Sequence, residues 1–100
     1  MEEKFIFRGE KINYNKGWID DDTYIFQFGE NKLKDNSGDN CFILAEYHKG
    51  SGKYIIQCWY DDEIATIYSE YSDKDTNKEI FPLTYSEIEN IKLFMKKLYR

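Results

Sequence analysis

Residues 41–71 constrain the fold most strongly, because apolar residues alternate through three segments that two short turns separate. Two glycines in residues 49–52 suit a four-residue hairpin loop, which needs positive φ angles. If His48 pairs with Lys53, one side of the first two segments carries Cys41, Ile43, Ala45 and Tyr47 opposite Tyr60, Cys58, Ile56 and Tyr54. A turn at residues 61–62 continues this side, with Glu63, Ala65, Ile67 and Ser69 opposite Tyr60, Cys58, Ile56 and Tyr54. A one-residue slip would destroy the pattern, so it predicts an antiparallel meander.

The other side of this meander is less polar than expected. Its apolar members are Phe42, Leu44, Ile55, Trp59, Ile64 and Tyr68, and its polar members are Glu46, His48, Gln57 and Thr66. A sheet that faces water on one side usually carries polar residues there. The pattern therefore indicates either a second core layer or a contact surface, and it leaves the two open.

The flanking segments complete an α+β domain over residues 1–100. Short strands are predicted at residues 4–8 and around residues 12–14, a turn at 15–17, a longer strand at 23–28 that Gly29 ends, and a brief edge strand at 79–81. Residues 30–40 are predicted to be an exposed loop. A helix over about residues 84–99 begins at Thr84, with Glu87 completing a capping box. We expect an antiparallel β-sheet of about five strands with this C-terminal helix packed on one face.

The charge is uneven along the chain. The net charge is −5, and residues 20–63 hold ten acidic and four basic side chains. This distribution disfavours direct nucleic-acid binding, which needs clustered Lys and Arg, and it favours a protein partner with a basic surface. Carboxylates concentrate at residues 20–22 and 61–63, where turn formation is the alternative explanation for their presence.

The location is predicted to be cytoplasmic. Cys41 and Cys58 are too few for a disulfide framework, and their diagonal placement across two strands predicts reduced core residues. The N-terminal residues lack the apolar core of a signal peptide. No apolar run approaches the roughly 20 residues that a membrane helix needs, so we expect no membrane association.

No catalytic, metal or cofactor motif emerges, and we expect a protein that is not an enzyme. His48 stands alone, without a nucleophile at a suggestive spacing, and is interpreted as a surface histidine. Residues 35–46 imitate the spacing of a calcium loop, but Asn40 occupies the position where the loop needs glycine. A solvated loop is therefore the preferred interpretation of this segment.

The function predicted on these grounds is that of a small acidic inhibitor that binds and neutralises a partner protein. Toxin-immunity proteins and phage-encoded anti-defence or anti-CRISPR inhibitors share this profile, which is an analogy of class. The predicted partner-binding residues are Phe42, Trp59, Ile64, Tyr68, Asp61, Asp62, Glu63, Asp20, Asp21 and Asp22. The alternatives are a small-ligand-binding domain with a tyrosine-lined pocket, and a homomeric structural or assembly subunit such as a homodimer.

Overall fold

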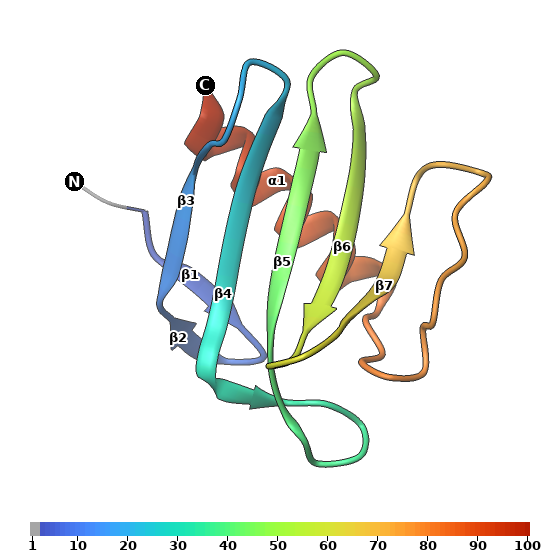
Figure 1. Ribbon diagram of the computed structural model, residues 1–100. Coiled ribbons are helices and arrows are strands. Elements are labelled where there is room, and N and C mark those ends of the chain that lie inside the picture. The colour runs from blue at the N-terminus through green and yellow to red at the C-terminus, as the bar shows by residue number, and fades with distance from the viewer. Residues whose placement is uncertain (1–2) are drawn as a thin grey trace.

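The computed structural model describes residues 3–100, which form seven strands and one helix in an α+β arrangement (Figure 1). The elements are β1 (Phe5–Phe7), β2 (Glu10–Ile12), β3 (Tyr14–Trp18), β4 (Thr23–Lys34), β5 (Asn40–His48), β6 (Lys53–Trp59), β7 (Ile64–Ser69) and α1 (Tyr85–Tyr99). The strands β3 to β7 form one antiparallel sheet in chain order, and β1 pairs with β2 in a separate hairpin. The predicted sheet and C-terminal helix are confirmed.

The sheet has a closed face and an open face. The closed face is covered by α1, which runs behind the sheet in Figure 1, and by the β1–β2 hairpin. Phe26 is fully buried there, with ring centroids 5.0 Å from Phe5 of the hairpin and 5.4 Å from Phe94 of the helix. One core therefore joins sheet, hairpin and helix on this side. The other side of the sheet, the open face, lies toward the viewer in Figure 1.

The predicted register of β5 and β6 is confirmed, from His48 opposite Lys53 to Phe42 opposite Trp59. The register of β7 is correct only at its start. Cys58 lies opposite Ala65 as predicted, but Ile56 lies opposite Tyr68 instead of Ile67. One extra residue, a β-bulge, enters β7 here. Both Ile67 and Tyr68 consequently pack against the closed-face core.

Strand β4 is longer than predicted, because Gly29 bends the strand instead of ending it. The register to β5 shifts between Phe28 and Leu33. Gly29 has a φ of 85°, and Leu33 folds back so closely that a Cβ on Gly29 would lie 2.3 Å from its Cδ1. Only glycine accepts both the conformation and this approach. The bend carries the last residues of β4 across the lower end of the sheet (Figure 1).

Two further predictions are wrong. Residues 15–17 form the middle of β3 instead of a turn, because this polar segment pairs along its length with β4. The edge strand predicted at residues 79–81 is a turn. Phe81 is nevertheless buried in the core, and the carbonyl of Ile80 accepts a hydrogen bond from the Asn36 amide at 2.7 Å.

The helix begins as its sequence indicates. The Thr84 hydroxyl accepts from the Glu87 amide at 3.1 Å, and the Glu87 carboxylate accepts from the Thr84 amide at 2.9 Å. Arg8 also donates from Nε to Glu87 at 2.7 Å, which ties the hairpin to the helix start. Lys92 contacts Glu70 at 2.6 Å and ties the middle of the helix to the end of β7. Both cysteines are free and buried, as predicted.

Candidate partner-binding surface

The open face has no cover of secondary structure from residues 3–100, although it holds several large apolar side chains. Leu44 and Ile55 are 7% and 3% exposed, so their neighbours on the face suffice to bury them. The cross-strand neighbours of Ile55 are Glu46 and Ser69, and Leu44 lies opposite Gln27 and Gln57. Most of the face is therefore closed over by its own polar side chains, as a solvated sheet surface requires.

The exception lies at one end of the face, where Phe42, Trp59 and Ile64 form what we call the aromatic surface. The rings of Phe42 and Trp59 stack with centroids 5.7 Å apart and planes 25° apart. Trp59 Nε1 donates to Gln57 Oε1 at 3.0 Å, which fixes the indole. Ile64 lies opposite Trp59 on β7 and is 50% exposed. This is a preorganised apolar patch of the composition that dominates protein interfaces.

Carboxylates crowd the same end of the sheet. The β4–β5 loop and the β6–β7 turn enclose an open hollow of about 550 Å³, whose lining includes Asp35, Asp39, Asp61, Asp62 and Glu63, here called the acidic end. A second hollow, of about 110 Å³, includes Phe42 and Trp59 in its lining. Asn40, Tyr60 and Asp61 line both hollows. The aromatic surface and the acidic end are thus contiguous.

The acidic end is held in place by Asp35. Its carboxylate accepts hydrogen bonds from the Tyr60 hydroxyl at 2.5 Å and from the amides of Ser37 and Asp39 at 2.9 and 2.8 Å. The bond from Tyr60, together with these amides, lowers the pKa of Asp35. The segment that imitates a calcium loop is therefore a turn organised around its first carboxylate. No group of three or more metal-ligating side chains suited to a metal ion occurs in the described part of the chain.

The structure divides the predicted partner-binding residues into three places. It brings together Phe42, Trp59, Ile64, Asp61, Asp62 and Glu63. Tyr68 is elsewhere, because the bulge turns it to the closed face, where it donates to Glu70 at 2.7 Å. Burial raises the pKa of Tyr68 to about 12, so it remains a neutral donor.

Residues 20–22 lie at the opposite end of the sheet, in the β3–β4 turn (Figure 1). Asp20 accepts from the amides of Asp22 and Thr23 at 2.8 and 2.7 Å, and these bonds lower its pKa. Asp22 Oδ1 accepts from the Gly50 amide at 2.6 Å and so joins two neighbouring turns. These two carboxylates have the local structural role that turn chemistry gives to aspartate.

Sequence reasoning missed Asp35 and Asp39 as members of the acidic end. A signal for them was present. In an antiparallel meander successive turns alternate between the two ends of the sheet, so the β4–β5 loop and the β6–β7 turn must share an end. Applied to the charged turns, this rule groups Asp35 and Asp39 with residues 61–63 and separates residues 20–22 from them.

His48 has more partners than the sequence suggested. Its Nε2 lies 2.9 Å from Glu46 Oε1, and its Nδ1 lies 2.6 Å from the Tyr71 hydroxyl, which lies 2.7 Å from Ser51 Oγ. The interpretation of His48 as a surface histidine did not include these partners, and the side chain is 22% exposed. The chain of contacts connects β5, the β5–β6 turn and the segment after β7 at the end of the open face away from the aromatic surface.

The tyrosines near the helix C-terminus pack against one another. Tyr47 and Tyr99 stack at 4.5 Å with planes 3° apart, and the hydroxyls of Tyr54 and Tyr99 lie 2.8 Å apart. This packing gives no support to a tyrosine-lined ligand pocket between sheet and helix. No helix within residues 3–100 is long and apolar enough to cross a membrane.

Comparison with known proteins gives no relative: no family model, curated protein or solved structure matches the chain. The surface geometry is therefore the evidence from which a function is inferred.

Proposed function

We propose that this protein is a small antagonist, which binds a partner protein through the aromatic surface and the acidic end and thereby neutralises it. The observation that carries the proposal is the stacked pair Phe42–Trp59, which no helix or strand of residues 3–100 covers and which lies beside a hollow lined by five carboxylates. Aromatic anchors surrounded by polar groups are typical of binding hot spots.

The charge pattern favours a basic partner over a second copy of the chain at this surface. In a two-fold dimer the same patch meets itself, so the carboxylates of one acidic end would approach those of the other. Asp61, Asp62 and Glu63 form no ion pair within residues 3–100, so their charge is available to an incoming cationic surface. Such a field accelerates encounter with a basic protein and opposes self-association through this surface.

The proposed roles of immunity protein and anti-defence or anti-CRISPR inhibitor share this mechanism. A protein that handles nucleic acid exposes Lys and Arg where phosphates bind. The carboxylates of the acidic end can occupy such a phosphate-binding site, while Phe42 and Trp59 contact an apolar surface of the partner beside it. Direct nucleic-acid binding by the acidic end itself is disfavoured by the same electrostatics.

The test is affinity capture with matched variants, followed by reconstitution. The tagged wild-type chain is compared with a surface variant, Trp59→Ala/Asp61→Lys/Glu63→Lys, and with a charge-matched control, Asp73→Lys/Asp75→Lys, in an exposed loop. We expect one basic protein to be retained by the wild type and the control and lost by the surface variant. The purified partner should then lose activity in proportion to added wild-type protein.

Equal capture by the wild type and the surface variant would contradict the proposal. So would a captured partner that binds stoichiometrically but keeps its full activity, because binding without neutralisation is not antagonism. Raising the salt concentration should slow association of the wild type with the partner, since screening removes the electrostatic contribution.

A further inference from the structure

Strand β3 offers an unpaired edge. The Ile19 amide donates to the Thr23 carbonyl of β4 at 3.0 Å, and the register continues without a shift to Tyr14 opposite Phe28. Amides in an antiparallel pair alternate in direction, so those of Asn15 and Gly17 also point to β4. The amides and carbonyls of Lys16 and Trp18 then point outward, where no strand of residues 3–100 pairs with them.

The other edge of the sheet is protected differently. At β7 the segment that follows the strand folds back beside it, and the Asn77 amide donates to the Thr66 carbonyl at 2.8 Å. At β3, by contrast, two apolar side chains stand exposed beside the free edge: Trp18 is 44% and Ile19 is 62% exposed. A free edge flanked by exposed apolar groups favours pairing with another strand.

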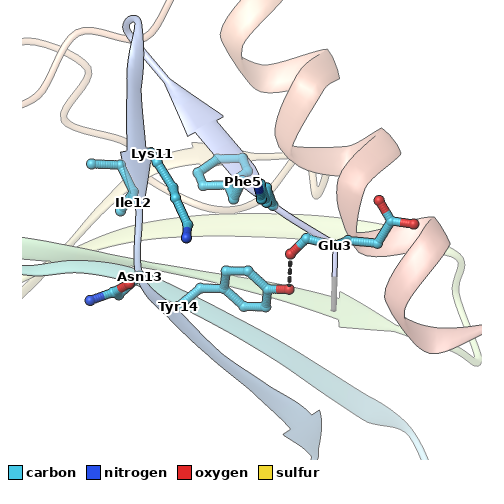
Figure 2. A pocket seen from close by; sticks show the side chains of 7 residues that line it. Glu3, Phe5, Lys11, Ile12, Asn13 and Tyr14 are labelled. Atoms are coloured by element: carbon cyan, nitrogen blue, oxygen red, sulfur yellow. Dashed lines mark hydrogen bonds between the residues drawn. The ribbon is translucent and has the colours of Figure 1, made fainter. Parts of the chain in front are cut away.

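The two ends of β3 carry opposite charges. The turn that follows it holds residues 20–22, of which Asp21 makes no hydrogen bond or ion pair within residues 3–100. Before it lies an open hollow of about 280 Å³, whose charged lining residues are Lys4, Lys11 and Glu3, so that its net charge is positive. Figure 2 shows this hollow, with the Lys11 side chain directed toward Tyr14. Neither lysine has an ion-pair partner in the described chain.

We propose that two copies of the chain pair antiparallel through β3, about a two-fold axis at Gly17, to form a continuous ten-stranded sheet. Antiparallel pairing brings the acidic turn of each copy to the lysine hollow of the other, so the favourable charge contact occurs twice. With the axis at Gly17, Lys16 lies opposite Trp18 of the second copy, where an ammonium group and an indole attract each other.

The neighbouring register with its axis at Lys16 is less favourable. An axis at Lys16 would place two lysines directly opposite each other, which is destabilising in a cross-strand pair. At Gly17 two backbones can approach closely, because glycine has no side chain and the space around this position is open. A two-fold axis perpendicular to the sheet keeps both open faces on the same side.

The proposed dimer would present the aromatic surface twice. The dimer proposal does not depend on the proposed function of that surface. Each copy keeps its own aromatic surface, because β3 and β7 are opposite edges of the sheet. The dimer therefore presents two such surfaces on one side. A partner with two sites would gain affinity from this arrangement without any new contact.

Sedimentation equilibrium and amide hydrogen exchange on the full chain test the dimer. We expect a concentration-dependent dimer, with the amides of Lys16 and Trp18 gaining protection as the concentration rises. The amides of Asn15 and Gly17 should be protected at every concentration, because they bond to β4. Lys16→Pro removes one outward amide and leaves the bonds to β4, so it should weaken the dimer at least tenfold.

A charge exchange tests the register. Asp21→Lys and Lys11→Asp should each abolish the homodimer, whereas an equimolar mixture of the two should form a 1:1 heterodimer, because both contacts then pair opposite charges. Asp75→Lys in the exposed loop is the control for net charge and should dimerise as the wild type does.

A monomer at all concentrations, with the amides of Lys16 and Trp18 unprotected, would overturn the proposal. A dimer that survives Lys16→Pro but is lost in Trp59→Ala would also overturn it, because association would then use the aromatic surface. Capture of the basic partner does not require the dimer, so each proposal can fail while the other stands.

Discussion

The two faces of the five-stranded sheet differ both in the polar side chains they carry and in what covers them. Both carry aromatic and aliphatic side chains on the same strands. On the closed face these meet a helix and a hairpin, and Phe26, Ile43 and Ile56 are fully buried. On the open face Leu44 and Ile55 are buried by their neighbours, while the aromatic surface remains accessible at one end. We infer that the closed face supports folding and the open face supports binding.

The largest effect should follow from emptying the closed face. Phe26 contacts aromatic rings from the hairpin, from the helix and from its own strand. Phe26→Ala should lower the free energy of unfolding by about 3–5 kcal/mol, because it removes a fully buried ring and leaves a cavity. Urea unfolding measures this change. A loss below about 1 kcal/mol would show that the closed face is not the principal core.

The next effect should appear in binding. Trp59→Ala should weaken capture of the basic partner by at least about 2 kcal/mol, roughly thirtyfold, because the indole anchors the aromatic surface. Leu93→Ala is the matched control, since Leu93 is an exposed apolar residue of α1, 57% exposed, away from this surface. Titration calorimetry with the purified partner gives both values. Equal losses of affinity in the two variants would show that binding does not depend specifically on the aromatic surface.

A smaller effect, on the free energy of unfolding, should follow from removing the Glu70–Lys92 ion pair, which joins the end of β7 to the helix. Burial alone would raise the pKa of Glu70, but hydrogen bonds from Lys92, Tyr68 and the Tyr54 backbone outweigh it and lower the pKa below 4.5. Because the folded-state pKa is depressed, the stabilisation is present above pH 4.5, the unfolded-state value, and is lost as the pH falls through the lower folded-state value.

Glu70→Gln should therefore cost about 1–2 kcal/mol at neutral pH and progressively less below pH 4.5. Thermal unfolding of both proteins across this range measures the difference. A cost that stays constant as the pH falls would mean that the charge of Glu70 is not what stabilises the contact.

Much of the fold could be predicted because local signals and pairing agreed. The glycine turn at residues 49–52 fixed the β5–β6 register, and Thr84 with Glu87 marked the helix start. The errors arose where pairing overrode local preference. Residues 15–17 have turn composition but pair with β4, Gly29 bends a strand instead of ending it, and no local pattern signals the bulge at Ile67.

The candidate surface could be predicted only where the strand register is regular. Phe42, Trp59 and Ile64 follow from the β5–β6–β7 register where it is regular, and Tyr68 was misplaced beyond the bulge. The acidic end depends on which turns share an end of the sheet, a property of topology that charge counts along the chain do not contain. The partners of His48 come from three separate segments and could not be inferred from spacing.

The central claim is that the aromatic surface is not needed for folding, and urea unfolding of Phe42→Ala/Trp59→Ala tests it most directly. Both rings are partly exposed and contact each other, so their joint removal should cost about 1–2 kcal/mol. The slope of the unfolding transition should stay unchanged. A loss of about 4 kcal/mol or more, comparable to that of Phe26→Ala, would place these residues in a second core and contradict the account.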